Sequence, residues 1–397
     1  MRRYESYKDS GVEWLGDVPS HWELGRISTY FTERRTKVSD KDYPALSVTK
    51  LGVFPQWENV AKTNDGDNRK LARKGDFVIN SRSDRKGSSG IAKQDGSVSL
   101  INIVLQPKKI NSVYSEYLFK SYNFIEEFYR VGHGIVADLW TTRFEDIKNS
   151  LIIYPPLSEQ QKIAQFLDDK IAKIDQAVDL AEKQIALLKE HKQILIQNAV
   201  TRGLNPDVPL KDSGVEWIGQ VPEHWEVKKI KAFAKINNGL DYKAVIAEEG
   251  YPVYGSGGQF AYANTYLYDG EAVLLGRKGT IDKPLYINDK FWTVDTMFYS
   301  VCNNKVSTKF FYYCCCSIIP FQYYSTSTAL PSMTQSDILN HKVTFPSLKE
   351  QYQIADYLDK QTAKIDQAIA LKTAHIEKLK EYKSVLINDV VTGKVQV

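Results

Sequence analysis

Two long segments of the chain have a series of mostly apolar positions at alternating intervals of four and three. In the first segment these positions are Leu167, Ile171, Ile174, Val178, Ala181, Ile185, Leu188, Lys192 and Leu195. In the second they are Leu358, Thr362, Ile365, Ile369, Lys372, Ile376, Leu379, Lys383 and Leu386. A mean spacing of 3.5 residues is typical of a coiled-coil seam. We therefore predict two helices of about 40 residues, roughly 60 Å each, that pair antiparallel within the chain.

The sequence also predicts where these helices begin and end. Ser158 with Gln161, and Ser347 with Glu350, follow proline at capping-box spacing, and Gly203 with Pro206 supplies a stop for the first helix. The alternative is two independent amphipathic helices, each packed on its own globular region. The same register held over about four heptads in both segments favours mutual pairing.

Gly- and Tyr-rich sequence with short strand-like runs, such as 76–80 and 271–275, precedes each helix. We therefore predict an α+β fold in which two mixed α/β domains are separated by the two long helices. The predicted boundaries are 1–154 for the first domain, 155–204 for the central helix, 205–345 for the second domain and 346–397 for the C-terminal helix. An antiparallel pairing would relate the domains by a pseudo-twofold axis and place them at opposite ends of a rod.

The two halves repeat each other in two blocks. KDSGVEWLGDVPSHWE (8–23) and KDSGVEWIGQVPEHWE (211–226) are identical at 13 of 16 positions, and the helix openings 157–177 and 348–368 at 13 of 21. The sequence between the blocks is nearly unrelated and is 12 residues longer in the first half. One architecture has been duplicated, and the regions between the repeated blocks have diverged. This is expected of a molecule that recognises two different targets with the same scaffold.

Composition indicates a globular cytoplasmic protein. The chain is 43% hydrophobic, and its formal net charge of +4 predicts local basic clusters rather than a uniformly basic surface. Four cysteines do not make a disulfide framework, and MRRYESYKDS lacks the apolar core of a signal peptide. The most apolar stretch, 310–321, is shorter than the roughly 18 residues of a membrane span.

The sequence contains no motif for catalysis or for a metal site. A P-loop, HExxH, GxSxG and zinc-type Cys/His spacing are all missing. Cys314, Cys315 and Cys316 are adjacent and cannot all face one tetrahedral metal, so we expect buried small side chains, with Ser121, Tyr122 and Asn123 as the counterparts in the first half. His21 and His224 lie beside Trp22 and Trp225 in the repeated block, where packing is the expected role.

Basic residues gather in the divergent regions, where a nucleic-acid reader needs cations for phosphates and polar loops for base edges. Arg82 and Arg277 align behind the matched strand runs, and solvated surface charge is the alternative for such clusters. The candidate DNA-binding residues are Arg69, Lys70, Arg73, Lys74, Arg82, Arg85, Lys86, Gln259, Arg277 and Lys278.

This arrangement resembles the specificity subunit of type I restriction–modification systems. The likeness rests on SGVEWLGDVPSHWE and SGVEWIGQVPEHWE, GDFVINSR and GEAVLLGRKG, and PPLSEQQKIAQFLDDKIAKID and PSLKEQYQIADYLDKQTAKID. The first half reads GDFVINSRSDRKGSSG where the second has the tighter GRKGT.

The resemblance implies a non-catalytic subunit without a cofactor of its own. Each divergent region would read one half of a split target in double-stranded DNA, and the helices would set the gap. Two modification subunits, which bind S-adenosylmethionine and methylate adenine, would dock on it, and restriction/motor subunits would join. The competing hypotheses are a fused nuclease or methyltransferase and a coiled-coil scaffold that does not touch DNA.

Overall fold

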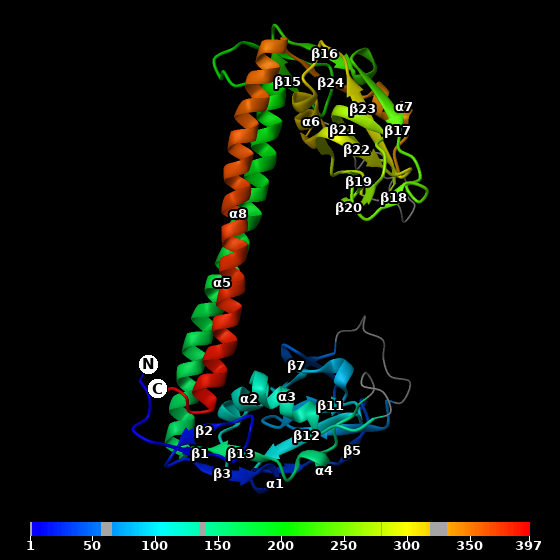
Figure 1. Ribbon diagram of the computed structural model, residues 1–397. Coiled ribbons are helices and arrows are strands. Elements are labelled where there is room, and N and C mark those ends of the chain that lie inside the picture. Colours follow the sequence, from blue (N-terminus) through cyan, green and yellow to red (C-terminus); the bar gives the residue numbers. More distant parts are fainter. Residues whose placement is uncertain (1, 57–65, 135–139, 279, 318–331) are drawn as a thin grey trace. The chain divides into compact units, whose positions relative to one another are not determined.

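The computed structural model describes residues 2–56, 66–134, 140–278, 280–317 and 332–397. Their contacts divide the chain into two compact units (Figure 1). Unit 1 is Met1–Leu180 with Ala374–Val397, and unit 2 is Ala181–Thr373. Each unit therefore contains one β-rich domain, part of the helix that follows this domain, and part of the other long helix. The mixed α/β fold class predicted from the sequence is confirmed.

The β-rich domain of unit 1 is built on a four-stranded sheet of order β10-β9-β12-β4 and a three-stranded sheet of order β11-β8-β5. Three pairs of strands, β1-β2, β13-β3 and β6-β7, complete its β structure among the described residues. The elements are β1 Tyr7–Asp9, β2 Asp17–Pro19, β3 Glu23–Arg26, α1 Ile27–Tyr30, β4 Phe31–Glu33, β5 Lys37–Val38, β6 Leu46–Thr49, β7 Gly52–Pro55, β8 Arg69–Ala72, β9 Phe77–Asn80, η1 Ser83–Arg85, β10 Ser89–Ile91, β11 Gly96–Val98, β12 Asn102–Pro107, α2 Ser112–Lys120, α3 Tyr122–Arg130, α4 Phe144–Ile147 and β13 Leu151–Tyr154.

Unit 2 has a single larger sheet of seven strands, in the order β17-β23-β21-β22-β19-β20-β18, with the pairs β14-β15 and β16-β24 beside it. The elements are β14 Leu210–Asp212, β15 Gln220–Pro222, β16 Glu226–Lys229, η3 Ile230–Ala232, β17 Ala234–Asn238, β18 Ile246–Ala247, β19 Tyr251–Gly255, β20 Gly258–Ala263, β21 Tyr268–Gly276, β22 Leu285–Thr293, β23 Met297–Cys302, α6 Thr308–Ser317, α7 Gln335–Asn340 and β24 Lys342–Phe345. The predicted strand runs are confirmed, as β9 and as part of β21.

The core of each unit lies where its sheet meets a short helix and the long helices. In unit 1, Phe77 of β9 packs with Phe119 of α2 at a ring-centroid distance of 5.1 Å, in the same buried cluster as Leu167. In unit 2, Leu275 of β21 and Phe311 of α6 share a buried cluster with Leu358. The seam residues at the start of each long helix therefore belong to the core of the domain before it.

The long helices are α5, Leu157–Arg202, and α8, Leu348–Val391, with 46 and 44 residues. In unit 1 the Lys383 ammonium lies 2.6 Å from a carboxylate oxygen of Asp175, and in unit 2 the Lys192 ammonium lies 2.7 Å from Asp366. As the residue number rises along α5, the partner's number falls along α8, so the helices run antiparallel. The predicted coiled coil is confirmed, with every predicted seam position buried or partly buried.

These two ion pairs are the same contact made twice. Asp366 lies 191 residues after Asp175, and Lys383 lies 191 residues after Lys192, which is also the offset between the two helix openings. Each helix therefore contributes an aspartate near its beginning and a lysine further on. This is the pattern required when two copies of one helix pair antiparallel.

The helix ends are partly as predicted. Ser347 and Glu350 form the capping box, with the Ser347 hydroxyl 2.7 Å from the Glu350 carboxylate, and Gly203 ends α5 at a positive φ of 77°. The prediction for Ser158 and Gln161 was wrong, because α5 begins at Leu157 and Ser158 is already inside it. The proline carbonyl at Pro156 accepts the amide hydrogens of Glu159 and Gln160, so the first turn needs no serine cap.

The cysteines are also partly as predicted. Cys314 and Cys315 are fully buried in the core of unit 2, and Cys316 is partly buried. Their expected counterparts Ser121, Tyr122 and Asn123 are wrong. Tyr313 donates to Asp359 as Tyr117 donates to Asp168, and Asp359 follows Asp168 by 191 residues. Because α6 thus matches α2, the counterparts of the three cysteines are Leu118, Phe119 and Lys120.

Candidate nucleic-acid interface

In each unit, side chains of the repeated block form hydrogen bonds with a glutamate in the first turn of the long helix that follows. The indole nitrogen of Trp22 donates to Glu159 at 2.9 Å, and a ring nitrogen of His21 lies 2.7 Å from the same carboxylate. In unit 2, Trp225 and His224 meet Glu350 at 3.1 and 2.8 Å. The expected packing role of both histidines is thereby realised as a hydrogen bond to a helix residue.

The carboxyl group of Glu350 has a lower pKa than an ordinary surface carboxyl group. Partial burial acts to raise its pKa, but hydrogen bonds from Ser347, His224 and Trp225 outweigh burial and lower the pKa to about 2. The charged form is therefore the one that unit 2 stabilises. The negative charge also lies in the first turn of α8, where the helix dipole favours an anion.

The strand-loop predicted to carry basic residues has the same construction in both units. After β9, the Ser81 carbonyl accepts the amide hydrogen of Thr142, and Arg82 forms a β-bridge with Thr141. After β21, the Arg277 carbonyl accepts from Met333, and Lys278 forms a β-bridge with Ser332. Each bridge leads directly into a short helix, α4 or α7.

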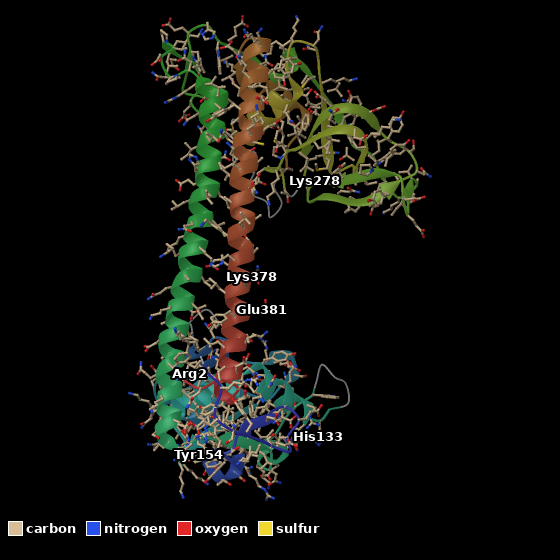
Figure 2. The ribbon with its side chains drawn as sticks, turned by 60° about the vertical axis from the view of Figure 1, so that its left-hand side comes forward. Arg2, His133, Tyr154, Lys278, Lys378 and Glu381 are labelled. Carbon is tan, nitrogen blue, oxygen red and sulfur yellow. The ribbon has the colours of Figure 1, made fainter. Side chains whose placement is uncertain are left out.

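The alignment of Arg82 with Arg277 is therefore wrong by one residue. Thr141 and Ser332 are 191 residues apart, so the residue that occupies the place of Arg82 is Lys278. Figure 2 labels Lys278 on the β-rich domain of unit 2. Arg82, Arg277 and Lys278 are all exposed. The Arg277 guanidinium lies 3.4 Å from the Asp295 carbonyl and 5.8 Å from the ring centre of Phe298, so the guanidinium itself is held against its own sheet.

Three of the other predicted residues are engaged by their own domain. Arg69 is 5% exposed and donates to the hydroxyl and carbonyl of Ser97. Lys70 donates to the Asn102 carbonyl at 2.8 Å, and Lys86 lies 2.6 Å from the Glu126 carboxylate. Arg73, Lys74 and Arg85 are exposed. Arg69 and Lys70 thus belong to strand β8 and stabilise the fold, whereas Arg73 and Lys74 follow the strand and are exposed.

Gln259 lies at the hairpin that joins β19 to β20, next to exposed aromatic residues that were not among the residues predicted to bind DNA. Gly258 adopts a φ of 108° in this turn, and Phe260 is 53% exposed. Tyr262 and Tyr266 are exposed as well, and the Lys290 ammonium lies 5.0 Å from the ring centre of Tyr266. Aromatic rings with a cation nearby can stack on bases. The signal was present as the closely spaced aromatics of GQFAYANTYLY (258–268).

Acidic residues, histidines and cysteines are the side chains that most often hold metal ions. The residues that the structure describes include no group of three or more His, Cys, Asp or Glu arranged to hold a metal ion. Burial raises the pKa values of the Cys314 and Cys315 thiols, which keeps both protonated at neutral pH. No helix in these ranges is long and apolar enough to cross a membrane.

With this geometry in view, the chain matches the family model of the type I restriction modification DNA specificity domain twice, over residues 20–189 and 222–381. It therefore belongs to that family and contains two copies of its domain. Each match begins inside a repeated block and runs through the β-rich domain into the long helix. The family resemblance seen in the sequence is confirmed.

One curated relative and two solved structures are similar to this chain over almost its whole length. The chain is 26% identical to the type I restriction enzyme MjaVIII specificity subunit of Methanocaldococcus jannaschii, over 96% of this chain and 94% of that one. It also superimposes on a chain of a solved structure described as the structural basis of complex assembly and conformational transition of the type I R-M system. The TM-score is 0.75 at 14% identity, and the match covers 95% of this chain and 99% of that one. The HsdS subunit from Thermoanaerobacter tengcongensis gives a TM-score of 0.55 at 15% identity, covering 95% and 98%.

Proposed function

We propose that this chain is the non-catalytic DNA-recognition subunit of a type I restriction–modification complex, with one β-rich domain for each half of a bipartite target in double-stranded DNA. The proposal rests on the duplicated family domain. Both copies make the same contacts between the repeated block and the long helix, and between the two long helices, while their sheets and loops differ. Two copies of one reader with different loops suit a target whose halves have different sequences.

The proposal assigns the DNA contact to exposed basic and polar side chains of the divergent loops. Arg82 and Lys278 are its first candidates because they occupy the same place in both domains. Arg73, Lys74, Arg85, Gln259 and Arg277 are exposed candidates beside them. The cytoplasm, where this DNA is accessible, is the compartment in which we expect the protein to act.

We infer further that two modification subunits dock on the long helices. Leu180, Leu187 and Ile194 repeat every seven residues on α5 and are all exposed, outside the seam. Leu371 and Val385, 191 residues after Leu180 and Ile194, are exposed on α8. Figure 2 labels Lys378 at the position between them. Exposed apolar residues at heptad spacing favour packing against helices of a partner.

In this proposal, methyl transfer and cofactor binding belong to the modification subunits, and DNA cleavage belongs to restriction/motor subunits. The sequence supports this division because it lacks motifs for either reaction. A fused nuclease or methyltransferase would need such a motif. A scaffold that never touches DNA would show no salt-dependent DNA binding.

The test is to map methylated adenines in cells that express the chain with its modification subunit, and to assay the purified chain alone. We expect a bipartite methylation motif that disappears when either domain is replaced. We expect the chain alone to bind duplex DNA with an affinity that falls as salt rises, without methylation or cleavage. Turnover by the highly purified chain, or a motif indifferent to domain replacement, would contradict the proposal.

A further inference from the structure

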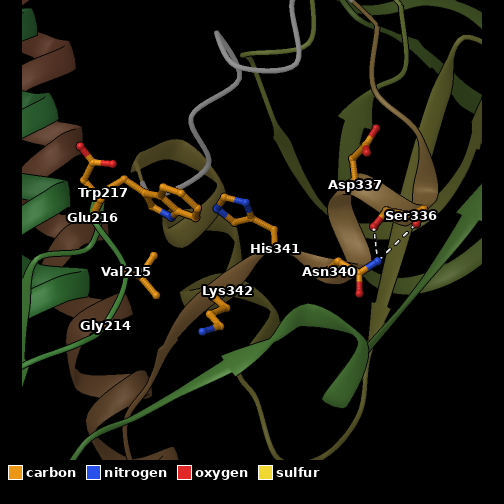
Figure 3. A pocket seen from close by; sticks show the side chains of 9 residues that line it. All are labelled: Gly214, Val215, Glu216, Trp217, Ser336, Asp337, Asn340, His341 and Lys342. Carbon is orange, nitrogen blue, oxygen red and sulfur yellow. Dashed lines mark hydrogen bonds between the residues drawn. The ribbon is translucent and has the colours of Figure 1, made fainter.

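The repeated SGVEW sequence lines one wall of a surface pocket in each unit. We call these the first and second GVEW pockets. In unit 1, residues 11–14 face α3 across a pocket of about 640 Å³. In unit 2, residues 214–217 face α7 and the start of β24 across about 440 Å³ (Figure 3). The wall formed by the Gly-Val-Glu-Trp sequence is the same in both pockets. The opposite wall differs, because α3 and α7 are different elements of the fold.

Part of the repeat is explained by the fold itself. Asp9 and Asp212 each accept the amide hydrogen of the glycine two residues on, and both glycines have positive φ, at 64° and 67°. The valine and the residue after the tryptophan are turned toward the core in each copy. The hairpin therefore accounts for Asp, Gly and Val, but not for the Glu-Trp pair at its surface.

The tryptophan of the repeat lines the pocket and keeps part of its surface exposed in each unit. Trp217 stacks on the buried ring of His341, at 5.1 Å between centroids and 19° between planes, and is still 41% exposed. Trp14 packs edge-on against the buried ring of Phe124 at 5.8 Å. Figure 3 shows Trp217 beside His341. The supporting rings differ between the pockets, so packing on one particular neighbour does not explain why the same indole is present twice.

Acidic side chains outnumber basic ones around both indoles. The first pocket includes Glu13, Glu126 and Glu127 with Arg130, and the second includes Glu216 and Asp337 with Lys342. Glu126 is paired with Lys86 and Glu127 with Arg130, which leaves Glu13 as the carboxylate that the first pocket offers to a partner. Within the described ranges, neither Glu13 nor Glu216 makes an ion pair. Carboxylates repel phosphate, so these pockets are poorly suited to DNA. An exposed indole beside a carboxylate suits a cationic side chain, above all arginine.

We propose that each GVEW pocket receives an arginine- or lysine-bearing segment of one modification subunit. The occupant follows from the repeat, because two identical walls in one chain fit two identical partners, whereas the DNA half-sites differ. The proposal rests on the proposed function, since it takes two modification subunits as the partners, and it adds a second contact to the one on the long helices.

The experiment uses the full chain with the modification subunit of the same system. Glu13→Lys, Glu216→Lys and the double variant are compared with Glu223→Lys, an exposed glutamate in the same repeated block that lies outside the pocket. Complex stoichiometry is measured by mass photometry, affinity by titration calorimetry and folding by thermal unfolding. Glu216→Gln adds a variant that removes charge without reversing it.

We expect each single reversal to weaken one of the two binding events by roughly tenfold or more, because like charges meet. The double reversal should weaken both, Glu216→Gln should have a smaller effect, and Glu223→Lys should match wild type. Two copies bound with unchanged affinity to the double variant, or an equal loss in Glu223→Lys, would overturn the pocket assignment. A wild-type chain that binds no modification subunit would instead refute the proposed function itself.

Discussion

Single side chains in this protein connect segments that are far apart in sequence. Glu350 caps α8 locally through Ser347 but also accepts from Trp225, 125 residues earlier. The capping spacing is visible in the sequence because it is local. The link to Trp225 is not, since a carboxylate near a helix start gives no sign of which distant indole it receives. The same reasoning applies to Glu159 and Trp22.

The lowered pKa of Glu350 makes unit 2 sensitive to acid. The pKa of this carboxyl falls from its ordinary value of 4.5 to about 2 in the folded state. Its charge therefore stabilises the fold above pH 4.5, and this contribution declines as the pH falls from 4.5 towards 2, where the unfolded chain takes up a proton that the folded one does not. We expect Glu350→Gln to cost about 1.5–3 kcal/mol at pH 7. The cost should shrink across that window, as measured by urea unfolding.

Glu249→Gln is the matched control for this experiment, because Glu249 is an exposed carboxylate in the same unit. Its cost should be near zero at every pH. A Glu350→Gln cost that stays constant from pH 7 to pH 3 would show that the hydrogen bonds of Glu350 do not depend on its charge.

The predicted DNA contact can be tested at the two equivalent basic residues. Arg82→Ala or Lys278→Ala should weaken DNA binding by ~1–3 kcal/mol if the side chain contacts a base, or lower the salt slope by about one if it contacts phosphate. Lys360→Ala, on α8 and paired with Asp356, is the control. Binding isotherms at several salt concentrations decide the outcome. If folded variants bind as wild type, the aromatic surface around Phe260 and Tyr266 becomes the better candidate.

At the scale of elements, the spacing of apolar residues predicted the two long helices well, because their pattern repeats regularly along the chain. The 3.5-residue pattern predicted both long helices and the face on which they pair, because a seam specifies which helix face is covered. It did not give the one-residue shift between Arg82 and Arg277, or the match of α6 with α2. Those depend on strand register and on tyrosine–aspartate contacts, and unrelated sequences in the two halves carry no such signal.

The seam and the exposed heptad positions should separate stability from docking. Ile365 is 9% exposed in the seam, so Ile365→Ala should cost about 2–4 kcal/mol of unfolding free energy. Leu371 in the same unit is 66% exposed, so Leu371→Ala should change stability by less than about 0.5 kcal/mol but weaken binding of the modification subunit. Chemical unfolding and calorimetry measure the two effects. Equal effects of both variants on stability would contradict the assignment of the two faces.

At the scale of the whole molecule, the duplicated frame predicts that two readers are used together. The contacts of Asp175 with Lys383 and of Asp366 with Lys192 show that each helix pairs with a copy of itself. A continuous seam of this kind resists stretching, because a shift along it breaks the packing of every following position. We therefore expect the helix pair to set the gap between the two DNA half-sites.

Insertion of seven residues into each helix tests this expectation. The insertions belong after Lys183 in α5 and after Ala374 in α8, midway between the two ion pairs along each helix. Seven residues keep the seam in phase and add roughly 10 Å, equivalent to about 3 bp at 3.4 Å per step. The methylation motif of the double-insertion variant should keep both half-sites and gain a spacer longer by this amount. Four-residue insertions at the same places rotate the seam out of phase and should abolish methylation. If the seven-residue variant methylates the original motif with the original gap, the spacing is set by the recognition domains or the partner subunits rather than by the helices.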